Sequence, residues 1–111
     1  MISYQENNLE INGEVLVLDY PIKKILQVKE FILVLLDPDL YTLKFGQFPN
    51  LKCYCFNGDF LWTADLPTHY TGDSYYNFFL EDGKLIALST RSFSCEIQIQ
   101  TGKILNSEFY K

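Results

Sequence analysis

Four glycine-containing turns divide this chain into short apolar runs, and they restrict its fold more than any other feature of the sequence. Asn12-Gly13, Asn57-Gly58-Asp59, Asp82-Gly83 and Thr101-Gly102 each lie between two runs that are rich in β-branched and aromatic residues. Gly, Asn and Asp tolerate the positive φ angles of tight hairpin turns. The pattern therefore predicts successive antiparallel hairpins, and no segment has the sustained 3.6-residue period of a helix.

The predicted strands form two similar units after an N-terminal hairpin. The hairpin covers residues 9–20, and the units cover residues 25–66 and 75–110. Both units end in a related hairpin, "CYCFNGDFLW" in the first and "IQIQTGKILN" in the second. We expect one all-β domain, residues 1–111, with a β-hairpin followed by two four-stranded antiparallel units. Their strands are expected at 25–28, 31–36, 52–56, 60–64, 75–80, 84–89, 93–99 and 104–109.

These hairpins resemble the turns between the third and fourth strands of quinoprotein-type β-propeller blades. Such blades combine an apolar strand, an Asp or Asn, a glycine turn and a strand that carries Trp. Trp62 occupies that position in "YCFNGDFLWTADL", whereas Asn106 replaces it in "EIQIQTGKILNSEF". The resemblance implies that the two units are propeller-like blades and that the chain is a half-propeller. It transfers nothing of the quinone site, which needs a complete ring of blades, and we expect no cofactor.

A closed propeller contains at least four blades, so two blades leave two outer faces without a neighbouring blade. We expect these faces either to be covered by the N-terminal hairpin and the long connections or to bind another chain.

The distribution of charge narrows the class of partner. The chain has a formal net charge of −5, and the window between Lys52 and Lys84 contains five carboxylates and nine aromatic residues but neither Lys nor Arg. Nucleic-acid binders interleave aromatic residues with cations, because they must neutralise phosphates. We therefore expect a basic protein as the partner and no binding to nucleic acid. The alternative is a solvated acidic loop between core strands.

The sequence contains no sign of export or of membrane insertion. The first residues lack a basic segment followed by an apolar stretch, and the longest apolar run, residues 31–36, is too short to span a membrane. Three cysteines, an odd number, favour reduced thiols. We expect a cytoplasmic protein that does not interact with membranes.

Cysteine and histidine residues give little support to metal binding or catalysis. Cys53 and Cys55 are expected on one face of a strand, but together with Cys95 and His69 they match no spacing of a zinc site. His69 and Ser74 lie in a loop that has no nucleophile elbow. We expect the cysteines to act as small buried hydrophobic residues. We predict no metal, no catalytic residue and no enzyme activity.

The segment from Asp65 to Tyr76 is the main candidate for partner binding. It combines tyrosines with carboxylates, and interfaces use rigid aromatic side chains together with complementary charge. One of Tyr75 and Tyr76 is expected to be buried, because adjacent strand residues face opposite ways. The turn at 37–41 is a second acidic and aromatic segment. The candidate partner-binding set is Asp37, Asp39, Tyr41, Asp65, His69, Tyr70, Asp73, Tyr75 and Tyr76.

In size, charge and predicted fold, the chain is similar to immunity proteins of bacterial contact-dependent growth-inhibition systems. That resemblance implies a non-enzymatic inhibitor that covers the active site of a basic, nuclease-type toxin. One alternative is a structural fragment in which two copies pair their outer faces or edge strands, although self-association is not favoured. Another is a small-molecule binder or enzyme that uses the His69 loop. This second alternative has little support, because the sequence shows no paired carboxylates, no phosphate-binding glycine loop and no metal cluster.

Overall fold

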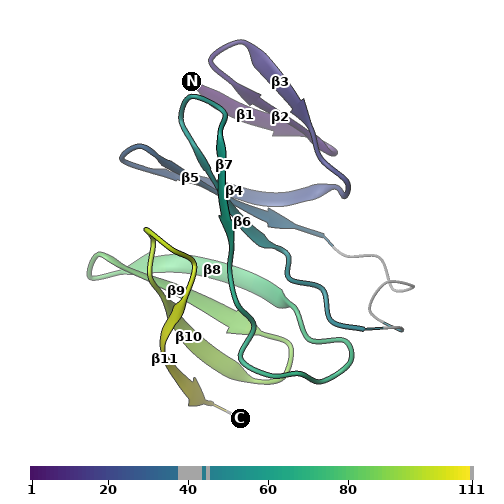
Figure 1. Cartoon of the computed structure of the whole chain (residues 1–111), viewed down its shortest axis with the longest axis vertical. Coiled ribbons are helices and arrows are strands. Elements are labelled where there is room, and N and C mark those ends of the chain that lie inside the picture. Colours follow the sequence, from purple (N-terminus) through teal and green to yellow (C-terminus); the bar gives the residue numbers. More distant parts are fainter. Residues whose placement is uncertain (38–43, 45, 111) are drawn as a thin grey trace.

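Three antiparallel β-sheets make up the structure, a computed structural model that describes residues 1–37, 44 and 46–110 (Figure 1). Sheet A contains β1 (Ile2–Gln5), β2 (Asn8–Ile11) and β3 (Glu14–Val17). Sheet B contains β4 (Ile22–Val28), β5 (Phe31–Leu36), β6 (Leu51–Cys55) and β7 (Phe60–Thr63). Sheet C contains β8 (Tyr75–Glu81), β9 (Lys84–Ser89), β10 (Phe93–Ile97) and β11 (Ile104–Phe109).

The prediction of an all-β fold is confirmed, and within each sheet the strands are ordered as they are in the chain. The N-terminal segment differs from the expected hairpin because β1 adds a third strand, with Ile2 opposite Ile11 and Tyr4 opposite Leu9. Glu6, at the β1–β2 turn, has a φ of 55°. This turn contains no glycine, and the residue with the positive φ is a glutamate and not the neighbouring Asn7, so the glycine-turn pattern did not mark it. The described residues include no helix long and apolar enough to cross a membrane.

Two of the predicted hairpin turns have both central residues in the left-handed region. Asn12 and Gly13 have φ angles of 50° and 91°, and Asp82 and Gly83 have φ angles of 52° and 78°. Two consecutive positive φ angles are the requirement of a type I′ turn, whose twist matches that of the flanking strands. The Asn-Gly and Asp-Gly pairs thus determine where β2 turns into β3 and β8 into β9.

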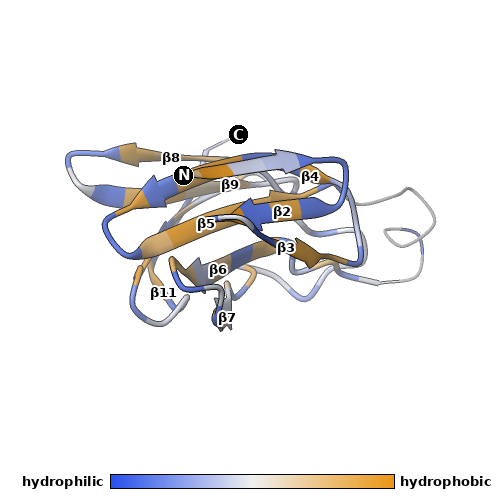
Figure 2. Cartoon of the chain, turned by 90° about the horizontal axis from the view of Figure 1, so that it is seen from above, coloured by the Kyte–Doolittle hydropathy of each residue, from blue (hydrophilic) through white to orange (hydrophobic). Residues whose placement is uncertain are grey.

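The first strands of the three sheets lie close together at one edge of the molecule. The Tyr4 hydroxyl of β1 donates to the Lys23 carbonyl of β4 at 3.1 Å, and the Lys23 ammonium donates to the Tyr76 carbonyl of β8 at 3.1 Å. In the view of Figure 2, β4 and β8 lie along one edge, and β7 and β11 lie along the opposite edge. The three sheets therefore meet through their first strands.

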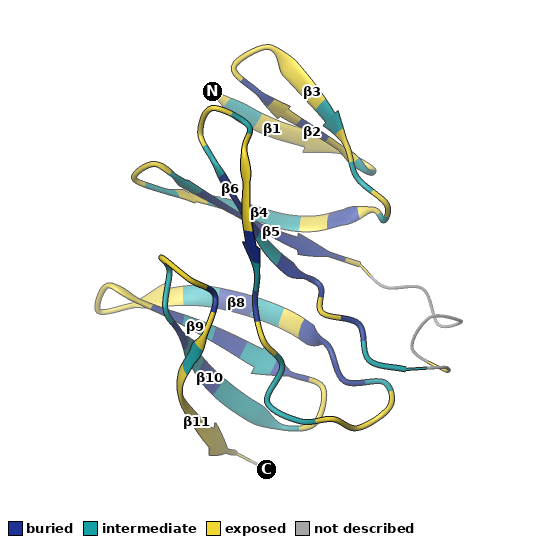
Figure 3. Ribbon diagram, in the orientation of Figure 1, coloured by how far each residue is buried: buried dark blue, intermediate teal, exposed yellow. Residues whose placement is uncertain are grey.

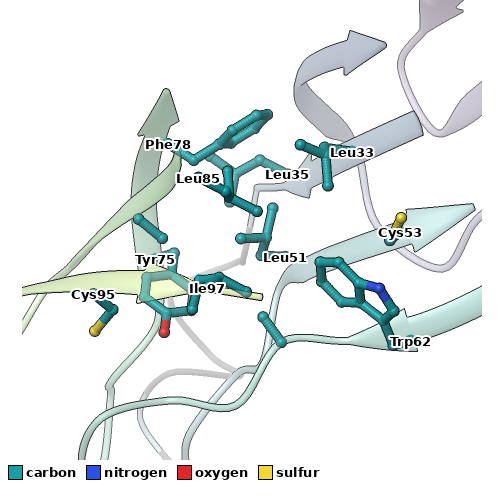
Figure 4. Packing of buried hydrophobic residues seen from close by; sticks show 12 residues of the cluster. Leu33, Leu35, Leu51, Cys53, Trp62, Tyr75, Phe78, Leu85, Cys95 and Ile97 are labelled. Atoms are coloured by element: carbon teal, nitrogen blue, oxygen red, sulfur yellow. The ribbon is translucent and has the colours of Figure 1, made fainter. Parts of the chain in front are cut away.

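Sheet B is covered on both faces. One hydrophobic cluster fills the space between sheets B and C, including Leu33, Leu51, Trp62, Phe78 and Ile97 (Figure 4). A second cluster lies between sheets A and B and includes Leu9, Ile11, Ile32, Val34 and Tyr54. Because both faces of β5 are covered, every residue from Ile32 to Leu36 is buried (Figure 3). This explains the unbroken apolar run at that position.

Candidate functional site

Part of the predicted partner-binding set lies at the surface. The side chains of Asp37, Asp65 and His69 are exposed, and those of Tyr70 and Tyr76 are 63% and 39% exposed. These residues are available for contact with another molecule. Two further members of the set, Asp39 and Tyr41, lie outside the described residues.

Two members of the predicted set are buried, and their assignment to a binding surface is corrected. Asp73 is fully buried and accepts hydrogen bonds from the Thr68 hydroxyl at 2.6 Å and the Ser89 hydroxyl at 2.7 Å. Tyr75 is 1% exposed, and its hydroxyl donates to the Asp65 carbonyl at 2.6 Å. Both side chains hold the β7–β8 loop against the sheets and do not face a partner. The expected burial of one of the two adjacent tyrosines is confirmed.

The exposed tyrosines already have neighbours within the chain. The Arg91 guanidinium lies over the Tyr70 ring, 5.4 Å from its centroid, and also donates to the Thr71 carbonyl. The hydroxyl groups of Tyr76 and Tyr110 are 2.6 Å apart. This hydrogen bond is the main cause that raises the pKa of Tyr110 to about 12. Arg91, a cation from outside the acidic window, therefore lies against the loop in which the sequence places tyrosines beside carboxylates.

Asp65 and His69 line one cleft of about 590 Å³, together with residues that include Gln47 and Ile104. Among the described residues that line it, only the threonines carry hydroxyl groups. Thr68 donates to Asp73, and Thr63 accepts a hydrogen bond from Lys52. The described residues contain no group of three His, Cys, Asp or Glu side chains that could hold a metal ion. The cleft thus presents a carboxylate and an imidazole.

The cysteines occupy the core and its margin. Cys53 and Cys95 are fully buried between sheets B and C, whereas Cys55 is only partly buried. Burial raises the pKa of the Cys53 thiol to about 12 and also raises the pKa of Cys95. Thiolates are the reactive and metal-binding form of cysteine. Both buried cysteines therefore stay protonated and pack as small apolar side chains.

Asn50 joins sheet B to sheet C, and no sequence pattern identified it. Its side-chain amide donates to the carbonyls of Leu36 and Tyr75 at 2.8 and 2.7 Å, and its side-chain oxygen accepts from the Tyr75 N–H at 2.8 Å. Asn50 is fully buried. A buried amide that satisfies three backbone groups has a structural role.

The last two strands of sheet C place a polar pair on its outer face where the corresponding pair of sheet B is apolar, while Ile86 and Leu88 of β9 keep part of that face apolar. In sheet B, Cys53 lies opposite Trp62 between β6 and β7, and both belong to the cluster that faces sheet C. In sheet C, the corresponding pair between β10 and β11 is Glu96 opposite Asn106. Strands β10 and β11 thus carry a polar pair at the position where β6 and β7 carry an apolar one.

The outer face of sheet A combines Asn8 and Glu10 with the exposed Val15 and Val17, and the charged side chains of this segment are all acidic. Leu9 and Ile11 point into the core, so Asn8 and Glu10 face outward, paired with Gln5 and Ser3. Residues 1–22 contain four carboxylates but no Lys, Arg or His. These carboxylates are all exposed: Glu6, Glu10, Glu14 and Asp19. The sequence could have revealed this segment, because it is as free of cations as the window from 53 to 83.

The nearest lysines of sheet B have other partners. Lys24 donates to the Phe78 carbonyl and lies 4.7 Å from the centroid of the Phe78 ring. Lys52 donates to the Thr63 hydroxyl at 3.0 Å. Burial lowers the pKa of Lys52, and the nearby Asp19 opposes that shift. Lys24 and Lys52 are thus held by carbonyl, hydroxyl and aromatic groups, and Glu6, Glu10 and Glu14 remain open to a partner.

The fold and these surfaces define a small all-β protein with three successive sheets and an acidic N-terminal segment. The chain belongs to the family described as Domain of unknown function (DUF7957), whose model matches residues 1–109. No curated protein and no solved structure matches the chain.

Proposed function

We propose that this chain is a non-enzymatic inhibitor of the immunity-protein type, which binds a basic, nuclease-type toxin and covers its active site. One observation carries the proposal: residues 1–22 expose four carboxylates, three of them in the strands or first turn of sheet A and one just after β3, and contain no cationic side chain. An enzyme that acts on nucleic acid needs a cationic surface to attract phosphates. The carboxylates of the acidic N-terminal segment would bind that cationic surface in competition with the phosphates of the substrate.

Charge complementarity would act mainly on the rate of association. Opposite fields steer two proteins toward each other and raise the association rate constant by about 10-fold to 1,000-fold at low ionic strength. Fast capture suits an inhibitor that must neutralise an enzyme before its substrate is cleaved. In this proposal, the exposed residues Asp65, His69, Tyr70 and Tyr76 remain a second contact area.

We infer further that sheets B and C are propeller-like blades. The support is the adjacency of the first strands and the contact of Trp62, on the last strand of sheet B, with the β10–β11 turn of sheet C. Pairing of the outer faces of sheet C between two copies would bury the polar pair Glu96 and Asn106 together with the apolar Ile86 and Leu88, and the cost of desolvating the polar pair weighs against it. The self-associating scaffold is therefore the weaker alternative.

The product of the open reading frame immediately upstream is the partner to test. We expect it to bind this chain tightly, and we expect co-expression to protect cells from its toxicity. The association rate constant should fall steeply between about 50 mM and about 500 mM salt, because screening shortens the range of the charges. No complex at low salt, or an association rate that does not respond to salt, would overturn the proposal.

A matched pair of variants localises the charge. Replacing Glu6, Glu10 and Glu14 together with Gln should lower the association rate constant about tenfold at low salt. The control replaces three exposed carboxylates of sheet C, Glu81, Asp82 and Glu108, with their amides. Both variants change the net charge by the same amount. An equal effect of the two would show that net charge and not sheet A determines binding.

A further inference from the structure

Sheet A has one strand fewer than sheets B and C. Sheets B and C have four strands each, and sheet A has three, with β3 at its edge. The strand order places β1, β4 and β8 in equivalent positions, so β3 corresponds to β6. The open side of β3 is therefore the place where β7 lies in sheet B.

The backbone of β3 is arranged to accept another strand. The Leu18 N–H donates to the Asn7 carbonyl at 2.8 Å, and Leu16 lies opposite Leu9 in the same ladder. Backbone groups alternate in direction along an antiparallel strand. The N–H and C=O groups of Val15 and Val17 therefore point away from β2. In the described part of the chain, β3 pairs with β2 alone.

A groove of about 370 Å³ lies beside this edge. Val17, Tyr54 and Phe60 are among the residues that line it, so β3, β6 and β7 all contribute to its wall. The described lining residues also include the carboxylate of Asp19 and the ammonium of Lys52. Val17 is 72% exposed and Phe60 is 53% exposed. The exposed Phe60 ring is therefore an apolar side chain at the groove, whereas Val17, which lies opposite the outward-facing Asn8, reaches the groove from the open edge of β3.

The junction between sheets B and C shows what fills the equivalent position there. Trp62 of β7 packs against Gly102, and its indole N–H donates to the Ile99 carbonyl at 2.6 Å. At the junction between sheets A and B, the equivalent turn glycine is Gly58. A Cβ atom at Gly58 would meet no described atom within 4 Å. The first junction therefore lacks the aromatic side chain that a fourth strand provides at the second.

We propose that the open edge of β3 binds an extended, basic segment of a partner protein, which adds the fourth strand of sheet A and places an aromatic side chain in the groove. Main-chain hydrogen bonds would supply affinity, and the groove would supply specificity. The basic character follows from the charge of residues 1–22, which include four carboxylates and no Lys, Arg or His. That the segment belongs to a toxin rests on the proposed function.

A second copy of this chain fits the edge less well. Two β3 strands that pair antiparallel around Leu16 bring two N-terminal segments side by side, and each segment has four carboxylates but no Lys, Arg or His. Like charges that are brought together repel each other. The charge pattern therefore favours a basic partner strand over self-pairing.

Synthetic peptides test the edge without knowledge of the natural partner. The probe is Lys-Lys-Phe-Leu-Trp-Thr-Lys-Lys, which copies Phe60–Thr63 of β7 between lysines. We expect saturable binding, with the largest amide NMR shifts at Val15 and Val17 and about tenfold slower hydrogen exchange at both. The same peptide flanked by glutamates should bind about tenfold more weakly. Equal binding of the two peptides, or shifts confined to other strands, would overturn the proposal.

A variant pair tests the backbone contact. Val15→Pro removes an N–H that faces away from β2, and edge strands tolerate Pro at such positions. It should abolish peptide binding, whereas Val15→Thr should retain it. Two N-methylated peptides, each blocked at alternate amides, test the same contact without altering the protein. The peptide whose methyl groups block the amides that face β3 should not bind, whereas the other peptide should bind. Unchanged binding of both peptides would contradict strand addition.

The outcomes separate this inference from the proposed function. If the upstream gene product binds Val15→Pro as tightly as the native chain and no peptide binds, the edge proposal fails while the inhibitor proposal stands. If the lysine-flanked peptide binds as expected and the upstream gene product does not, the inhibitor proposal fails instead. A β3-dependent dimer in sedimentation, lost in Val15→Pro, would assign the edge to a second copy and overturn the basic occupant.

Discussion

The indole ring of Trp62 occupies the space in front of Gly102. A Cβ atom at Gly102 would lie 2.5 Å from Cε3 of Trp62, and the residue has a φ of +78°. The Asp65 N–H also donates to the Gly102 carbonyl at 3.1 Å. This contact fastens the end of β7 to the β10–β11 turn, on the side of the molecule opposite to the first strands. Sheets B and C are thus joined at both edges.

Replacing Gly102 should destabilise the protein more than replacing another turn glycine. Gly102→Ala forces a methyl group into the indole ring, whereas Gly83, with the same φ of +78°, has open space around it. Both changes carry the cost of an alanine in the left-handed region. We expect Gly102→Ala to lower the free energy of unfolding by about 1–3 kcal/mol more than Gly83→Ala does. Urea denaturation measures the free energy of unfolding of both variants, and an equal loss in the two would contradict the contact between Trp62 and Gly102.

Asn50 should be among the most sensitive polar positions. Asn50→Ala leaves the Tyr75 N–H and the carbonyls of Leu36 and Tyr75 without their side-chain partner. An unsatisfied buried group costs about 1–3 kcal/mol, so we expect a loss of at least about 3 kcal/mol in the free energy of unfolding. The exposed Asn106 provides the control, because Asn106→Ala should change stability by less than about 0.5 kcal/mol. Similar effects at both positions would refute the bridging role.

Thiol labelling should distinguish the three cysteines. At pH 8 in the native state, an alkylating reagent should modify Cys55 first, because Cys53 and Cys95 are buried and their pKa values are raised. In concentrated urea all three should react at similar rates. Peptide mass spectrometry identifies the modified residues. Labelling of Cys53 or Cys95 before Cys55 in the folded protein would show that these thiols are accessible.

Stability should decline in alkaline solution. Burial raises the pKa of Cys53 to about 12 and raises the pKa of the Tyr75 hydroxyl, so the folded state keeps both groups protonated. In the unfolded chain they ionise at about pH 8.5 and about pH 10. The unfolded state therefore binds fewer protons above these values, and the free energy of unfolding falls as pH rises. We expect a plateau below about pH 8 and a decrease from about pH 9 upward, by at most about 1.4 kcal/mol per pH unit and group.

Cys53→Ala provides the control for this pH dependence. The variant should be less stable at neutral pH, because it loses buried volume, but its stability should fall less steeply between about pH 9 and about pH 10. Denaturant midpoints measured from pH 7 to 10.5 give both slopes. Identical slopes for the native chain and the variant would mean that Cys53 does not contribute.

Much of the sheet structure could be predicted, because turn residues mark the ends of most strands. The bounds of β5, β9 and β11 agree with the expected runs at 31–36, 84–89 and 104–109. Strand β10 ends two residues earlier than expected, at Ile97, because the Gln98 carbonyl accepts the Thr101 and Gly102 N–H groups and begins the turn. A pattern of apolar residues marks a strand, but it does not determine which carbonyl closes the turn.

The candidate site was harder to predict, because burial depends on partners that are distant in the sequence. Asp73 is a charged residue in a polar loop, so the sequence predicts that it is exposed. It is buried because the Ser89 hydroxyl, 16 residues away in the sequence, donates to its carboxylate at 2.7 Å. Asn50 and Tyr75 meet across 25 residues. A single sequence does not place such pairs together. The acidic character of residues 1–22 was visible in the sequence, but the open edge of β3 depends on the strand order.

Sheet B separates two hydrophobic clusters and contributes one face to each. Its central strand β5 supplies Leu33 and Leu35 to one cluster and Ile32 and Val34 to the other. Melting these strands would open both interiors simultaneously, so neither end sheet can keep its packing when the middle one is lost. The molecule should therefore unfold in a single cooperative transition, despite having two separate cores.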